Sequence, residues 1–148
     1  MLRVAGPVRA IGRLPDGPLV GIQPAGDGYG LAFGLEDGTW LADSTTDPLE
    51  RRSGLVAGAI AFFLASLEDP PADLEASHAD LARVVGSLAA HLTSDEERVT
   101  LSQALDAVDD GLPPDAVALR LIPLLPSTDA DPVEILRARY ARANPRQG

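Results

Sequence analysis

The chain has 148 residues and a net charge of −10, and it contains neither cysteine nor lysine. The lack of cysteine excludes disulfides, thiolate metal sites and cysteine nucleophiles, and the lack of lysine excludes Schiff-base chemistry and a P-loop lysine. One domain of this length buries roughly 68–70% of the surface that its unfolded chain exposes. We therefore expect residues 1–148 to form a single domain.

The first 43 residues alternate apolar and polar side chains in short runs that turn sequences separate. Pro15-Asp16-Gly17 is a typical turn, in which we expect Gly17 to accept a positive φ, and Glu36-Asp37-Gly38 is a strong hairpin signal. Proline interrupts the first strand at Gly6-Pro7, which predicts a bulge or an edge strand there. Consecutive strands joined by such turns predict a four-stranded antiparallel meander. Its first strand comprises residues 2–4 and 8–10, on either side of Gly6-Pro7, and the other three strands cover residues 19–23, 29–35 and 39–43.

A central helix is predicted over residues 47–69, because Asp47 suits the N-cap, Pro48 suits the first helical position and Pro70-Pro71 ends the pattern. Both sides of this helix are apolar, which is typical of a buried helix. We expect its bulky side to face the sheet and its small side to face another helix. The apolar run extends only about 21 Å, too short for a bilayer core of roughly 30 Å. The two sides consist of Val56, Ile60, Phe63 and Leu67, and of Gly54, Gly58, Ala61 and Ala65.

The acidic residues concentrate in the second half of the chain. Residues 68–131 contain 14 acids and three arginines, whereas residues 132–148 contain four arginines and one acid. Capping residues and apolar stripes predict an acidic helical part over residues 71–125, followed by an arginine-rich helix and tail over 131–148. Strands followed by helices indicate the α+β fold class, with the meander packed on the long buried helix and a small helical cluster beside it. The helices of the acidic part are predicted over residues 71–92, 94–110 and about 117–121.

No group of residues in the sequence predicts a catalytic, cofactor-binding or metal-binding site. His78 follows Glu75 by three residues, but a di-iron bundle requires this motif twice. The glycines at 26, 28 and 30 lie where a hairpin is expected, without the following helix of a dinucleotide-binding loop. The acidic pair Asp109-Asp110 stands at a helix C-terminus, where negative charge is unfavourable.

The interaction candidates are one arginine cluster and two aromatic residues. Four arginines gather in the last 17 residues, and tryptophan and tyrosine are frequent at binding hot spots. Four arginines with one interleaved tyrosine, on a chain of charge −10, make nucleic acid an unfavourable partner. The candidates are Arg137, Arg139, Arg142, Tyr140 and Trp40.

Three functions remain open from the sequence. The first is a non-enzymatic, acidic protein-interaction module, such as a regulator, an inhibitor or immunity-type protein, or a chaperone, with a basic partner. The second is a small-molecule-binding or enzymatic domain with a pocket between sheet and helices, involving Tyr29, Trp40 or His78. The third is a homo-oligomer in which the arginine-rich helix docks on the acidic surface of a second copy. No membrane partner and no cofactor are expected, and the absence of a signal peptide predicts a cytoplasmic location.

Overall fold

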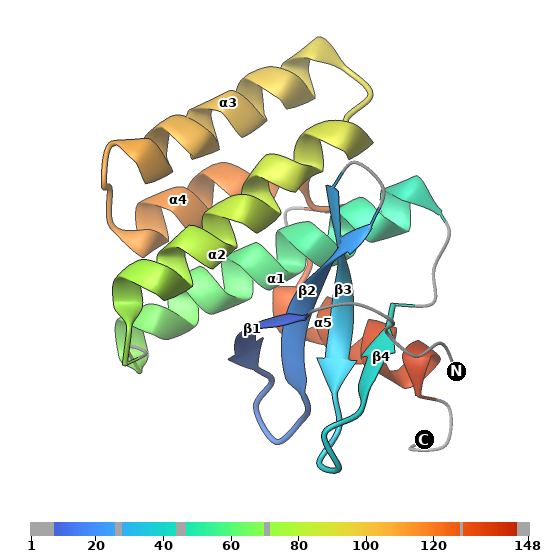
Figure 1. The fold of residues 1–148 in the computed structure, drawn as a ribbon. Helices are drawn as coiled ribbons and strands as arrows, with labels where there is room; N and C mark the ends of the chain where they lie inside the picture. The colour runs from blue at the N-terminus through green and yellow to red at the C-terminus, as the bar shows by residue number, and fades with distance from the viewer. Residues whose placement is uncertain (1–7, 26–27, 44–46, 70–71, 128, 145–148) are drawn as a thin grey trace.

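The computed structural model describes residues 8–25, 28–43, 47–69, 72–127 and 129–144, which form a sheet followed by helices (Figure 1). The predicted α+β fold and its antiparallel meander are confirmed, with strand order β1-β2-β3-β4. Short 3₁₀ turns at Leu88–His91 and Ile122–Leu124 extend α2 and α4. The strands and helices are β1 (Arg9–Arg13), β2 (Leu19–Ala25), β3 (Gly28–Gly34), β4 (Trp40–Ala42), α1 (Pro48–Glu68), α2 (Leu74–Ser87), α3 (Asp95–Asp109), α4 (Pro114–Leu121) and α5 (Pro132–Ala143).

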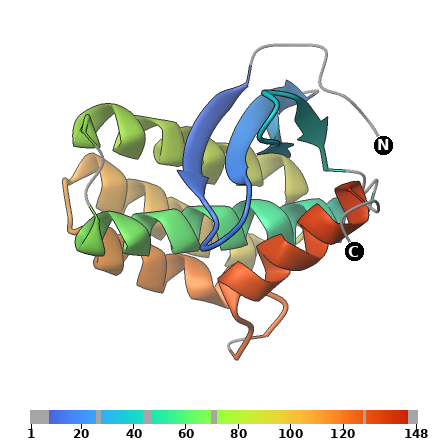
Figure 2. The same cartoon turned by 90° about the horizontal axis from the view of Figure 1, so that it is seen from below.

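Helix α1 is the centre of the molecule. Figure 2 shows it between the sheet on one side and helices α4 and α5 on the other. Every residue from Ser53 to Ile60 is buried, as the prediction of a core helix requires. The burial ends before the helix does, because Leu64 and Leu67 are 43% and 49% exposed. The prediction that Leu67 lies on a buried side is therefore wrong.

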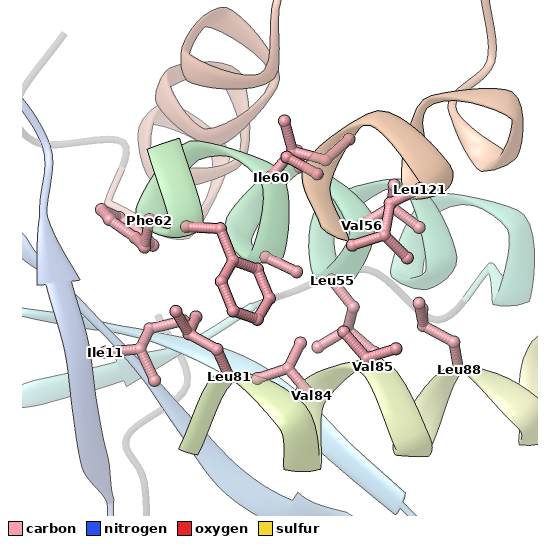
Figure 3. Close-up of a cluster of buried hydrophobic side chains, with 14 of the residues drawn as sticks. Ile11, Leu55, Val56, Ile60, Phe62, Leu81, Val84, Val85, Leu88 and Leu121 are labelled. Carbon is pink, nitrogen blue, oxygen red and sulfur yellow. The ribbon is translucent and has the colours of Figure 1, made fainter. Parts of the chain in front are cut away.

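The predicted orientation of α1 is also wrong, because its small side faces the sheet. A Cβ atom added to Gly54 would lie 2.9 Å from Leu31 Cδ1, and one added to Gly58 would lie 3.6 Å from Leu31 Cδ2. On the bulky side, Val56 lies beside Leu121 of α4 (Figure 3). The sheet already presents large side chains to the helix, so small residues on α1 let the two layers interdigitate at native density.

The helix ends follow their capping residues. Asp47, Ser94 and Asp131 each accept a backbone hydrogen bond in the first turn of α1, α3 and α5, as their positions predict. At the end of α3, Gly111 has a φ of 71°, and the amides of Gly111 and Leu112 donate to the carbonyls of Val108 and Ala107. This is the Schellman arrangement that a glycine stop predicts.

The turns β1–β2 and β3–β4 share one hydrogen-bond pattern. The amides of Leu14 and Leu35 donate to the carbonyl oxygens of Pro18 and Thr39, while those of Gly17 and Gly38 donate back to Leu14 and Leu35. Gly38 has a positive φ of 88°. In the first turn the prediction for Gly17 is wrong, because Asp16 takes the positive φ instead, at 54°. Aspartate tolerates this region better than most residues. The bulge in the first strand lies between Ala10 and Gly12, and Gly6-Pro7 falls outside the described residues.

Candidate interaction surfaces

Two of the predicted interaction arginines attach α5 to α1. Arg139 Nη1 lies 3.2 Å from Glu50 Oε2, and Arg142 Nη1 lies 2.9 Å from the same oxygen. The Arg139 side chain is only 10% exposed, whereas that of Arg142 is 53% exposed. A guanidinium that is buried and bonded to a carboxylate of its own chain contributes to the folded structure rather than to a binding surface. Of this pair, Arg142 has the more accessible side chain for a partner.

Arg137 and Tyr140 also make contacts within the chain. Arg137 Nη1 bonds Glu134 Oε1 at 2.8 Å, and its Nη2 donates to the Pro15 carbonyl oxygen at 3.3 Å. The Tyr140 ring packs on Phe33 with ring centroids 5.5 Å apart. These contacts bring α5 against the sheet. Arg146, the fourth arginine of the cluster, lies outside the described residues.

Trp40 lies apart from the arginine cluster. Its neighbour Leu41 is buried on the α1 side of the sheet, so the alternation of β4 places Trp40 on the opposite side. The indole covers two glycines: Cβ atoms added to Gly21 and Gly34 would lie 3.0 Å and 3.2 Å from it. The five predicted interaction residues therefore do not form one surface.

His78 contacts Ser66, but the hydrogen bonds do not suit a nucleophile. Ser66 Oγ donates to the Phe63 carbonyl oxygen at 2.7 Å, and His78 Nε2 lies 3.3 Å from Oγ. When the hydroxyl donates to this carbonyl, Oγ can only accept from the imidazole, in the tautomer that carries the proton on Nε2. A serine nucleophile needs the opposite arrangement, in which the imidazole accepts the hydroxyl proton.

His91 lies among charged side chains at the N-terminal end of α1. Burial and the guanidinium groups of Arg51 and Arg52 lower the pKa of His91 below its ordinary value of 6.5. Arg52 is itself paired with Glu97 of α3. The backbone hydrogen bond from Thr93 is the main cause that holds the pKa of Glu97 below its usual 4.5. This cluster joins α1, the 3₁₀ turn after α2 and the start of α3.

Acidic side chains gather at one end of the helical layer. The C-terminal ends of α1 and α3 and the first turns of α2 and α4 lie at the same end of the helical layer in both views (Figures 1 and 2). Exposed leucines accompany them: Leu64, Leu67 and, at 39% exposure, Leu112. None of the ion pairs between described residues includes a carboxylate of this surface. We call it the acidic end; its seven exposed acids are Glu68, Asp69, Asp73, Asp106, Asp109, Asp110 and Asp115.

The acidic end could be found only in part from the sequence. The unfavourable position of Asp109-Asp110 is visible there, as is the high acid content of residues 68–131. That the C-terminal ends of α1 and α3 lie at the same end of the helical layer depends on how α2 and α4 pack between these two helices. No local pattern encodes that packing.

Two hollows differ greatly in size. The one between the sheet and α1 has a volume of about 50 Å³ and is lined in part by Leu31, Asp43 and Leu55. The other has about 1180 Å³ and lies between the β1–β2 and β3–β4 turns and α5. A water occupies about 30 Å³ of liquid volume, so the first holds one or two waters.

The described part of the chain holds neither a membrane-spanning helix nor a group of metal-ligating side chains. Among the helices within the described ranges, none has the length and apolar content needed to cross a membrane. Within the same ranges, no three side chains of the metal-ligating types converge. Comparisons with protein-family models, curated proteins and solved structures found no match.

Proposed function

We propose that this protein is a non-catalytic interaction module that binds a basic protein partner through the acidic end. The surface combines seven carboxylates with three exposed leucines. A partner that presents basic groups around an apolar centre would complement it in charge and in polarity.

One observation carries the proposal: two helices end in acids where acids reduce stability. The last turns of α1 and α3 contain no basic residue, and Glu68, Asp106 and Asp109 lie in or beside them. A carboxylate near a helix C-terminus opposes the helix dipole by about 0.3–1 kcal/mol. Residues that cost folding energy without an evident compensating contact are typical of functional sites.

The proposal predicts that stability and binding change in opposite directions when these acids are neutralised. In the triple variant Asp106→Asn, Asp109→Asn, Asp110→Asn, we expect a free energy of unfolding higher by about 1–3 kcal/mol. We expect the dissociation constant for a synthetic amphipathic helix, with arginines flanking a leucine stripe, to rise about tenfold. Urea unfolding and calorimetric titration at low salt measure the two effects.

A matched control separates the acidic end from net charge. The variant Asp129→Asn, Asp131→Asn, Glu134→Gln removes three charges at the start of α5, and asparagine at 131 still caps that helix. Equal weakening of peptide binding in both triple variants would show that total charge alone attracts the peptide, and would refute the proposal. A fall in stability of the acidic-end variant would refute its electrostatic argument.

The exposed leucines provide a second test. Leu64→Ser with Leu67→Ser should weaken binding of the same peptide, because their burial contributes to binding and serine removes it. Val99→Ser with Leu119→Ser is the control, since these side chains are 57% and 66% exposed on α3 and α4. In pull-downs from native lysate, a genuine partner must be lost with the first pair of substitutions and retained with the second.

A further inference from the structure

The larger hollow is an open groove between two hairpin turns. One wall is the β1–β2 turn, the other is the β3–β4 turn, and α5 contributes Tyr140 and Asn144. We call it the hairpin groove. Its lining on the strands and turns is Arg13, Asp16, Gly17, Pro18, Leu19, Gly34, Leu35, Glu36, Asp37 and Gly38.

We propose that the hairpin groove binds an extended peptide segment in which an arginine lies between apolar side chains. The proposal does not depend on the acidic end. The volume of about 1180 Å³ exceeds the roughly 300–1,000 Å³ of small-molecule pockets, and such pockets enclose most of their ligand. An open groove of this size suits a chain segment better than a metabolite.

The charges of the groove select a basic occupant. Three carboxylates and one guanidinium line it, and both Asp16 and Glu36 are exposed, on opposite walls. Arg13 Nη1 donates to the carbonyl oxygen of Gly17 at 3.3 Å, so its guanidinium is partly engaged within its own turn. A guanidinium from a partner would be attracted by the net negative charge of the lining and could pair with a carboxylate on either wall.

Apolar groups and fixed walls complete the site. Leu19, Leu35 and Tyr140 supply apolar surface that aliphatic side chains beside the arginine could cover. Backbone hydrogen bonds of the same pattern fix the conformation of both turns. The hydrogen bond from Arg137 to the Pro15 carbonyl oxygen also connects the β1–β2 turn to α5. A groove that is already formed spares a ligand the cost of ordering it.

The test uses the full chain labelled with ¹⁵N and the blocked peptide acetyl-Ala-Leu-Arg-Leu-Ala-amide. We expect this peptide to shift the amide resonances of Gly17, Gly34 and Gly38 and the side-chain amide of Asn144. Replacing its arginine by citrulline, which is neutral and of similar shape, should abolish the shifts at millimolar peptide. Asp16→Asn and Glu36→Gln should each raise the dissociation constant about threefold, and the double variant about tenfold.

The variants remove charge with little change in shape. Asparagine tolerates the positive φ at position 16 as aspartate does, so the turn is retained. Asp129→Asn, an exposed acid outside both the groove and the acidic end, is the control and should leave the affinity unchanged. Equal binding of the citrulline peptide, or shifts confined to the acidic end, would overturn the proposal. Shifts of the groove resonances on dilution of the protein alone would identify a second copy as the occupant and would also overturn it.

Discussion

Gly12, Gly54 and Gly58 set how closely the sheet and α1 approach. A Cβ atom on Gly12 would lie 2.2 Å from Phe62 Cδ1, far inside van der Waals contact. At Gly54 the corresponding distance to Leu31 Cδ1 is 2.9 Å, while at Gly58 the nearest atom is 3.6 Å away. These positions therefore differ in the room that they leave, and only Gly58 has space for a methyl group.

Substitutions at Gly58 test this contact. Gly58→Leu should lower the free energy of unfolding by about 1–3 kcal/mol, because the longer side chain overfills the space before Leu31 and Ile11. Gly58→Ala is the control and should raise it by up to about 1 kcal/mol, since its Cβ fits and alanine favours the helix. An unchanged melting temperature in the leucine variant would mean that α1 does not pack on the sheet here.

His91 should make stability depend on pH in the mildly acidic range. Its pKa is lowered in the folded state, so the unfolded state binds the proton more tightly. The contribution of His91 to the free energy of unfolding is therefore complete above pH 6.5, the ordinary pKa of histidine. It decreases as the pH falls from 6.5 towards the lower pKa of the folded state. His91→Gln should flatten this slope in urea unfolding measured from neutral pH to about pH 5. Glu97→Gln should instead change the slope near and below pH 4.5.

At the scale of elements, α5 is held to the rest of the fold by polar as well as apolar contacts. Leu136 and Ala143 are buried, Tyr140 packs on Phe33, and Glu50 accepts from two arginines of α5. Glu50 also lies in the first turn of α1, where the helix dipole favours its charge. One carboxylate thus stabilises the start of one helix and the docking of another.

Neutralising Glu50 should weaken the docking of α5. Glu50→Gln leaves the largely buried Arg139 without its carboxylate, and we expect a loss of about 1–3 kcal/mol in the free energy of unfolding. Glu134→Gln removes an exposed pair with Arg137 and should change stability by less than about 0.5 kcal/mol. Hydrogen exchange should show faster opening of α5 in the first variant. Equal stability of the two variants would argue against a structural role for Glu50.

At the scale of the whole molecule, charge is separated rather than balanced. The acidic end lies on the helical layer, while Arg137, Arg139 and Arg142 are bonded to groups of the same chain. Assembly of copies through Arg139 would require this side chain to exchange Glu50 for a carboxylate of a neighbour, whereas Arg142 is exposed. Two acidic ends would repel each other at low salt.

We therefore expect the protein to be monomeric, with a mass of 15.4 kDa in solution. Light scattering coupled to gel filtration, at low and high protein concentration and at two ionic strengths, measures this. A dimer that dissociates in salt would favour assembly through arginine and carboxylate groups. The Arg142→Gln variant would then identify the contact, since Arg142 is the more exposed partner of Glu50.

The sequence by itself determined the elements and their order. Hairpin glycines, capping acids and paired prolines act within a few residues. Three strands of the meander and the helices α1, α3 and α5 could therefore be predicted close to their observed bounds, whereas β1 runs to Arg13 and not to residue 10. Only the tertiary structure decided three further features. These are the orientation of α1, the attachment of α5 through Glu50, and the position of the acidic ends of α1 and α3 at the same end of the helical layer. Each depends on which large side chains fill the space between layers and which charges meet across them. These contacts join residues far apart in the chain, and helical or strand periodicity carries no information about them.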